Sequence, residues 1–520
     1  MRSDLLRRKF LVAVVLLAVL VAAYFRWRAS AVAFDDSYIS FRYAFNLIHH
    51  RGLVYDPGER VEGYSNFLWV LFAAAALALR GDPLTATRAL GVASYLATIA
   101  LAGAFLFRLV RGKRDLVGVS MLALLVLPAG FAALAGCGLE TSFVALLIVV
   151  LGLTQHVVPA GSTRRQLALG AIPLLLCLTR LDAALALVAS ALATAVDERV
   201  KGSAWRALAA TLLRRFAVCI VGLAVYFVWK KLYYGELMPN TYYAKAADRL
   251  QLRAGYTYLV TFFWNSPQVV VLAPAAVLAL SDYWDTKLRA FVVYAALFLV
   301  AFTAYVVKVG GDFMYYRFAF EAYPLYVMVA AMGVVALCRR ALSAALVVAV
   351  TAIACATTPP VYEKTYGMQT NADMNAFVDA GREVGVALDR RLPPRTIIAT
   401  TLAGTVAYYS DLVTIDDWGL NDREIAHQPS PLIHYRGHVK AASKEYLARR
   451  GVNLELHHPI ICRCSAPCRE ALPNVFVRVG DDRCVRTWYL TQTDALTEYF
   501  CAHPESFVLN NVHCPAPHEN

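Results

Sequence analysis

Long apolar runs recur along the sequence from Phe10 to about residue 356, and this repetition constrains the fold more than any other feature. With 59% hydrophobic and 17% charged residues over 520 positions, the chain has too little polar surface for a water-soluble globule. We therefore predict a polytopic α-helical membrane protein. The formal net charge of +13 does not indicate a nucleic-acid partner, because Lys and Arg gather in short loops between apolar runs, where they set membrane topology.

The basic loops also fix the direction in which the helices cross. The run at residues 10–25 follows Arg7-Arg8-Lys9, with no small-residue cleavage site before Arg26, so we expect a retained span and a cytoplasmic N-terminus. The run at 67–79 is shorter than the roughly 20 residues a bilayer requires, which predicts an interfacial or re-entrant helix. The other predicted spans are residues 86–107, 116–135, 142–158, 166–179, 183–196, 216–233, 259–280, 290–307, 319–337 and 341–356. These eleven spans place the chain after about residue 357 outside the cytoplasm.

Polar motifs gather at the outer ends of the predicted spans. The first outer loop, residues 26–85, carries two adjacent carboxylates, Asp35 and Asp36, close to the membrane surface. Further polar groups lie at the outer span ends, in residues 136–141, 179–182, 234–245 and 310–318. A carrier would be expected to place polar groups at the bilayer midplane. The distribution therefore favours an enzyme that works at the outer leaflet.

The region from 357 to 520 is predicted to be a separate extracytoplasmic α/β domain. Residues 396–400, 412–416 and 475–479 have the composition of short buried strands, with a helical turn at 403–409. Its Cys-rich tail, residues 455–520, predicts disulfides, because an even number of cysteines in an exported domain is typical of disulfide bonding. The six candidates are Cys462, Cys464, Cys468, Cys484, Cys501 and Cys514. A metal site formed by Cys462, Cys464 and Cys468 with nearby histidines is the alternative, but that spacing matches no common zinc pattern.

Several motifs together resemble the GT-C glycosyltransferases, in particular bacterial cell-envelope arabinofuranosyltransferases that use a decaprenyl-phosphate sugar donor. The motifs, in chain order, are DDSYISFRYAFNLIHHRGLVYDPGERVEGYSNFLW, GLETS, TRLDA, YYGELMPNTYYAK, GGDFMYYRF and IDDWGLND. The resemblance covers most of residues 30–425, with Leu181-Asp182 standing where the family pattern has Pro-Glu. The sequence after about residue 455 matches nothing in that family.

The resemblance implies transfer of a sugar, arabinofuranose or a similar one, from a polyprenyl-phosphate donor to a cell-envelope glycan, lipid or protein. It implies a multi-pass protein of the bacterial cytoplasmic (inner) membrane, with membrane lipids as further partners. Because phosphate is a good leaving group, the site needs a carboxylate near the acceptor hydroxyl or anomeric centre and cations for the phosphate. Asp35 or Asp36 is the candidate catalytic carboxylate. The candidate phosphate-binding cations are Arg317, Lys245, Arg180 and Lys308.

Other polar residues of these motifs are candidates for binding substrate. They are Glu62, Tyr64, Asn66, Glu140, Asp182, Asn240, Asp312, Tyr316, Asp417, Trp418, Asn421 and Asp422. Structural roles stay open for several of them, because Arg180 with Asp182 and Arg317 with Asp312 could form ion pairs in helix-end loops, and Asx residues beside Gly also make turns. Paired aspartates can hold Mg²⁺ or Mn²⁺ or can work without a metal, and no third ligand is evident nearby. A catalytically silent lipid- or glycan-binding relative and a polyprenyl-lipid transporter are the alternative functions.

Overall fold

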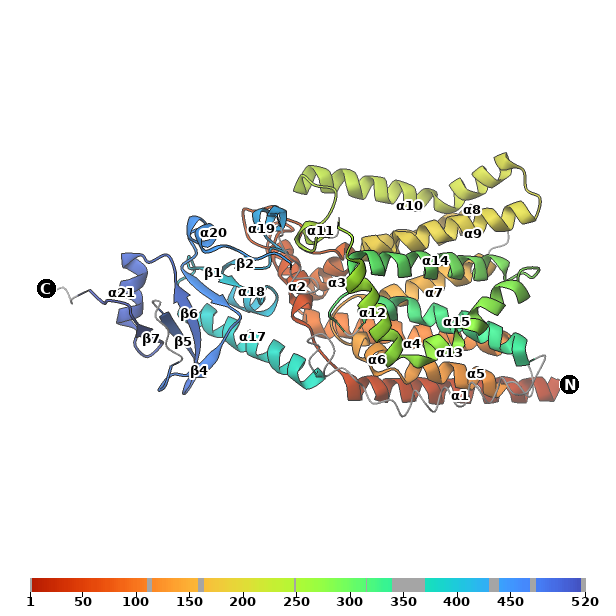
Figure 1. Ribbon diagram of the computed structural model, residues 1–520, viewed down its shortest axis with the longest axis horizontal. Helices are drawn as coiled ribbons and strands as arrows, with labels where there is room; N and C mark the ends of the chain where they lie inside the picture. Colours follow the sequence, from red (N-terminus) through yellow and green to blue (C-terminus); the bar gives the residue numbers. More distant parts are fainter. Residues whose placement is uncertain are drawn as a thin grey trace.

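The structure is a computed structural model, and it describes residues 2–109, 115–157, 163–246, 249–314, 316–338, 370–429, 439–467 and 474–515. Two parts follow one another along the long axis of the molecule (Figure 1). A bundle of helices forms the N-terminal part, and a sheet with its own helices forms the C-terminal part. The boundary predicted near residue 357 lies outside the described residues.

All regular elements that the structure describes in the N-terminal part are helices. Its helices are α1 (Arg2–Ser30), α2 (Asp35–Ile48), α3 (Phe67–Ala78), α4 (Pro83–Leu109), α5 (Asp115–Val126), α6 (Ala129–Ala135), α7 (Thr141–Val157), α8 (Thr163–Thr179), the 3₁₀ turn η2 (Leu181–Ala183), α9 (Ala184–Val200), α10 (Trp205–Tyr234), α11 (Asn240–Ala244), α12 (Leu252–Asn265), α13 (Pro267–Asp282), α14 (Arg289–Val309) and α15 (Arg317–Cys338). Helix α3, with 12 residues, is the short apolar helix predicted at 67–79.

Within the described ranges, five helices are long and apolar enough to cross a membrane: α1, α4, α10, α14 and α15. Two predicted spans are each broken into two helices. The span at 116–135 bends by 62° between α5 and α6, and the span at 259–280 bends by 95° between α12 and α13. Proline explains both breaks, because Pro128 precedes α6 and Pro267 begins α13, and proline disfavours the helical conformation in the residue before it. The span predicted at 341–356 lies outside the described residues.

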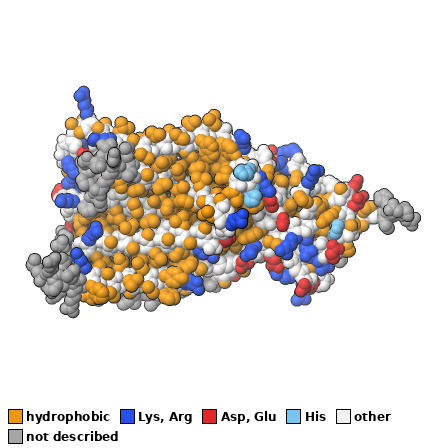
Figure 2. All heavy atoms as spheres, turned by 180° about the vertical axis from the view of Figure 1, so that it is seen from behind, with side chains coloured by type: hydrophobic (Ala, Val, Ile, Leu, Met, Phe, Trp, Pro, Cys, Tyr) orange, Lys and Arg blue, Asp and Glu red, His pale blue; other side chains and the backbone are white. Residues whose placement is uncertain are grey.

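The surface of the helical part is apolar. Figure 2 shows hydrophobic side chains over its middle, and charged side chains at its far end and over the C-terminal part. Large apolar side chains point outward there, with Trp264 85% and Leu232 80% exposed. Helix α15 lies at the centre of the bundle, because 89% of its apolar 18-residue stretch is buried. The corresponding share for the peripheral helix α10 is 17%. The chain is therefore a multi-pass membrane protein.

The C-terminal part is built on one mixed sheet. Its strands are β1 (Ile397–Thr400), β2 (Val413–Asp416), β3 (Leu454–His457), β4 (Ile461–Arg463), β5 (Asn474–Gly480), β6 (Arg483–Tyr489) and β7 (Phe507–Asn510). Their order is β2-β1-β3-β6-β5-β7, with β4 paired to β6; β1 runs parallel to β2 and β3, and the other pairs are antiparallel. The accompanying helices are α17 (Asn371–Arg391), α18 (Thr405–Ser410), α19 (Arg423–His427), α20 (Lys444–Arg449) and α21 (Asp494–Ala502). The predicted α/β character, three strands and helical turn are confirmed.

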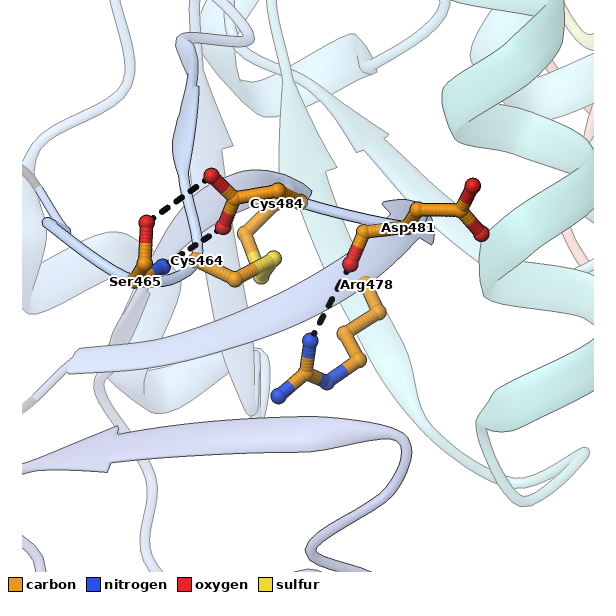
Figure 3. The surroundings of a disulfide bond; sticks show 6 residues. Cys464, Ser465, Arg478, Asp481 and Cys484 are labelled. Carbon is orange, nitrogen blue, oxygen red and sulfur yellow. Dashed lines mark hydrogen bonds between the residues drawn. A yellow bond between two sulfur atoms is a disulfide. The ribbon is translucent and has the colours of Figure 1, made fainter.

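Two disulfides cross-link the Cys-rich tail, residues 455–520. Cys464 is bonded to Cys484 and Cys501 to Cys514, so four of the six candidate cysteines pair as predicted. The first bond joins the end of β4 to β6, and the segment is also held by Ser465, which donates two hydrogen bonds to Asp482 (Figure 3). Cys468 lies outside the described residues, and Cys462 belongs to neither bond.

Candidate functional site

The two adjacent aspartates begin helix α2, where acidic residues are favoured by the helix dipole, and they have different surroundings. Asp35 accepts hydrogen bonds from the backbone amides of Gly404 (2.9 Å) and Thr405 (2.8 Å) and from the Thr405 hydroxyl (2.5 Å). Its carboxylate thus caps helix α18 of the C-terminal part. The approach requires glycine at 404, because a Cβ there would lie 1.9 Å from the Asp35 carbonyl oxygen. Asp35 therefore connects the N-terminal and C-terminal parts of the molecule through hydrogen bonds.

Asp36 is half-buried, and its carboxylate makes no hydrogen bond or ion pair to any residue that the structure describes. Its charge acts on Lys245, which follows helix α11. Burial lowers the pKa of the Lys245 ammonium, and Asp36 opposes that effect by favouring the charged form. Asp35 thus accepts three hydrogen bonds within the fold, whereas Asp36 has no such partner among the residues that the structure describes.

Lys245 also lines a cavity of about 320 Å³ at the end of the bundle that faces the sheet. All four cations predicted to bind phosphate, Arg180, Lys245, Lys308 and Arg317, line this cavity, which we call the cation pocket. They come from four different segments, namely the α8–η2 junction, the end of α11, the last turn of α14 and the start of α15. Two of the predicted substrate-binding carboxylates, Asp182 and Asp312, are also in its wall.

The two arginines of the pocket are held in position by ion pairs with carboxylates. Arg180 forms ion pairs with Asp182 (2.5 Å), Glu140 (3.0 Å) and Glu321 (3.5 Å). Arg317 is 3.3 Å from Asp312. The ion pairs considered as an alternative role for Arg180 and Arg317 are therefore present. Both arginines nevertheless remain in the pocket wall. Lys308 lies exposed at the rim.

A second and larger cavity, of about 900 Å³, lies between α12, α13, α14 and α15. Its wall is almost entirely apolar. Helices α14 and α15 line both cavities: Phe302 and Ala319 face the apolar one, while Lys308 and Phe318 face the cation pocket. An amphiphile with an anionic head and a long hydrocarbon chain matches these two adjoining environments.

Three further predicted substrate-binding residues connect the first outer loop to other segments of the helical part. Glu62 pairs with the buried Lys230 at 2.6 Å, and the Tyr64 and Tyr234 hydroxyls are 3.0 Å apart. Asn66 donates to Glu140 at 2.9 Å and so supports the carboxylate that holds Arg180.

Of three others, Asn240 and Asn421 make contacts between the two parts of the molecule, and the Asp422 side chain is used within the C-terminal part. Asn240 donates to three carbonyl oxygens of residues 419–422, and Asn421 lies against Asp416 and Tyr43. Asp422 caps helix α19 and accepts hydrogen bonds from Tyr446 (2.5 Å) and Arg450 (2.9 Å). We call this contact zone the seam: residues 35–66 and 240–244 on one side, residues 403–425 on the other.

Glu140, also predicted to bind substrate, pairs with Arg180 and accepts the hydrogen bond from Asn66. The remaining three predicted residues are not in the wall of the cation pocket. Tyr316 packs on Tyr258 and Phe262, and its hydroxyl accepts a hydrogen bond from Asn265. Asp417 and Trp418 follow strand β2. The structure therefore brings the four cations together with Asp182 and Asp312, and the charge of Asp36 acts on Lys245. Most of the other candidates form hydrogen bonds or ion pairs within the fold.

Two important charged residues were missed by sequence reasoning. Arg42, with a fully buried side chain, donates across the seam to Asp411 (2.6 Å) and to the Leu412 carbonyl oxygen, and on its own side to the Tyr55 carbonyl oxygen. Glu321 stands behind Arg180, one turn inside α15. The signal for Glu321 was available, because a carboxylate inside an apolar run four residues after a predicted phosphate ligand is unusual.

Comparison with known proteins agrees with this architecture. A family model described as "Domain of unknown function (DUF8728)" matches residues 366–494. The structure of ArnT from Cupriavidus metallidurans bound to undecaprenyl phosphate superposes with a TM-score of 0.52 at 12% identity, covering 91% of this chain and 97% of that one. The chain has the GT-C fold. The apo-state ArnT structure gives a TM-score of 0.48 at 13% identity over the same shares. No curated protein sequence matches the chain.

Proposed function

We propose that the protein is a membrane glycosyltransferase that transfers a sugar from a polyprenyl-phosphate donor. The observation that carries this proposal is the cation pocket beside an apolar cavity of about 900 Å³. Guanidinium and ammonium groups in a partly desolvated site bind phosphate, and the apolar cavity suits an isoprenoid chain. The undecaprenyl phosphate bound to ArnT, which shares the fold, is a lipid of this class.

In the proposed reaction, Asp36 and the cations of the pocket have different roles. The acceptor hydroxyl oxygen forms a bond to the anomeric carbon, while the bond from that carbon to the phosphate oxygen breaks. The hydroxyl proton passes to the Asp36 carboxylate, which acts as general base. The electron pair leaves with the polyprenyl phosphate, whose growing negative charge Arg317, Lys245 and Arg180 stabilise. Asp35 holds helix α2, and hence Asp36, against the C-terminal part.

We propose an outer-leaflet site in a bacterial cytoplasmic membrane, with the C-terminal part outside the cytoplasm. The positive loops at the opposite span ends and the two disulfides support this topology. A reporter that is active only when exported, fused after about residue 370, should be active. Cys464, Cys484, Cys501 and Cys514 should resist alkylation until they are reduced. Freely reactive thiols and an inactive reporter would contradict the topology.

Arabinofuranose is the proposed sugar, and a cell-envelope glycan, lipid or protein the proposed acceptor. The test incubates purified protein in detergent with a panel of polyprenyl-phosphate sugars and a mixed envelope extract, and measures release of polyprenyl phosphate. We expect one donor to be consumed by the wild-type protein and by Arg423→Ala, a variant of the seam that is not in the pocket wall, and not by Asp36→Asn. Lipid binding without consumption of any donor would instead favour a catalytically silent relative. Consumption by Asp36→Asn at the wild-type rate would contradict the assigned base.

A further inference from the structure

We propose that Asp417, Glu455 and His457 form a binding site for a divalent cation in the C-terminal part. Within the described residues, this is the place where three potential metal ligands converge, with one ligand atom from each lying within 4.8 Å of the others. The site is separate from the cation pocket, whose wall contains none of the three residues.

The sheet brings these residues together. Asp417 follows β2, and Glu455 and His457 belong to β3, while β1 lies between these strands and runs parallel to both. The carboxyl ends of β2 and β3 therefore meet at one edge of the sheet. Open α/β sheets commonly bind ligands at this edge.

The environment of Asp417 is an independent sign of a ligand. Asp417 is only 4% exposed, yet neither oxygen of its carboxylate accepts a hydrogen bond from any residue that the structure describes. The nearest cationic group is Nδ1 of His457, 3.6 Å from Oδ2 and thus beyond hydrogen-bond distance. A buried carboxylate without partners is costly, and a bound cation would remove that cost.

Lys444 is the competing explanation for the acidic pair, because its ammonium forms an ion pair with Glu455. This contact leaves Asp417 unsatisfied, however, and the Lys444 side chain is 56% exposed and can turn towards solvent. The ion pair also uses one Glu455 oxygen and leaves the second for a metal.

The donor set limits the choice of cation. One imidazole nitrogen and two carboxylates suit Zn²⁺ or Mn²⁺ better than Mg²⁺ or Ca²⁺, which prefer oxygen ligands alone. Three protein ligands leave at least one coordination position for water or another oxygen ligand.

The test uses the full-length protein, purified in detergent with a tag that contains no histidine, stripped with chelator and equilibrated with Zn²⁺ or Mn²⁺. Bound metal is measured by inductively coupled plasma mass spectrometry after gel filtration. We expect about one equivalent per chain, lost at least tenfold in Asp417→Asn and in His457→Asn. His458→Asn is the matched control, because His458 is the neighbouring histidine, contacts Thr401 and lies outside the cluster. It should bind metal like the wild type.

Binding should also raise the melting temperature of the wild type and of His458→Asn only. If Asp417→Asn does not fold, Glu455→Gln and His457→Asn decide the question. A wild-type protein that binds neither metal, or equal binding in all variants, would overturn the proposal.

Discussion

The cation pocket and the seam contain similar residues in opposite situations. In the seam, Asp35, Asn240 and Asp422 each have several protein partners, so their hydrogen-bonding capacity is used within the fold. In the cation pocket, arginines are held by ion pairs with carboxylates while they still line a cavity. The comparison teaches that buried charge alone does not identify a functional site. A charge that is positioned by the protein and still faces open space does.

The largest expected effect separates the two aspartates. Asp36→Asn should lower kcat by several hundred-fold or more, a loss typical of removing a general base or key electrostatic stabiliser, while the melting temperature stays at the wild-type value. Turnover of the proposed donor and thermal unfolding, measured on the same preparation, check this.

Asp35→Asn should behave in the opposite way. Its amide cannot accept all three hydrogen bonds, so the contact with α18 weakens by about 1–3 kcal/mol. The melting temperature should fall, and activity per folded molecule should change less than in Asp36→Asn. If Asp35→Asn loses activity as severely as Asp36→Asn without losing stability, the two roles are exchanged.

The second effect concerns the phosphate contact in the pocket. Arg317→Ala should cost about 2–4 kcal/mol of transition-state stabilisation, or roughly 30- to 1000-fold in kcat/KM for the donor. Arg317→Lys should rescue it partly, because a point charge cannot reproduce a planar two-pronged contact. Arg423→Ala is the matched control, since Arg423 donates to the Tyr234 carbonyl in the seam. A loss below about threefold, or a loss for the acceptor alone, would make Arg317 only a partner of Asp312.

A third, smaller effect tests whether Asp422 has a structural role. Asp422→Ala removes a helix cap and two further hydrogen bonds, so stability should fall by about 1–3 kcal/mol. The melting temperature should show the loss, while KM for donor and acceptor stays within about twofold. A large rise in KM for the acceptor at unchanged stability would instead return Asp422 to the substrate site.

The smallest effect is expected at the pocket rim. Lys308 is exposed, and charges in contact with solvent contribute little. Lys308→Ala should raise KM for the donor by no more than about threefold, and the difference should shrink in high salt because of screening. A salt-independent loss of tenfold or more would place Lys308 inside the phosphate site.

The membrane part was predicted from apolar runs, the α/β part from short strand-like segments, and the four cations from family-like motifs at the outer ends of predicted spans. Apolar runs and basic loops fix which span ends share a side of the membrane, and this brings distant segments such as Arg180 and Arg317 to one place. The two helix breaks were not predicted, although Pro128 and Pro267 were visible, because hydropathy alone does not report a bend.

The seam could not be predicted from the sequence. Asp35 and its partner Thr405 are 370 positions apart, and neither carries a local signal of the other. The carboxylates that hold Arg180 also come from distant segments, as Glu140 and Glu321 show. Whether a polar side chain has partners within the fold depends on such tertiary contacts, so the sequence alone could not separate structural residues from substrate-binding candidates.

Binding of a polyprenyl phosphate to the cation pocket tests the central claim most directly. Native mass spectrometry of the purified protein can compare undecaprenyl phosphate with the uncharged undecaprenol, for the wild type, Arg317→Ala and the seam control Arg423→Ala. We predict that the wild type and Arg423→Ala prefer the phosphate at least tenfold, and that Arg317→Ala loses most of this preference. Equal preference for the phosphate in all three proteins, or none in the wild type, would contradict the account.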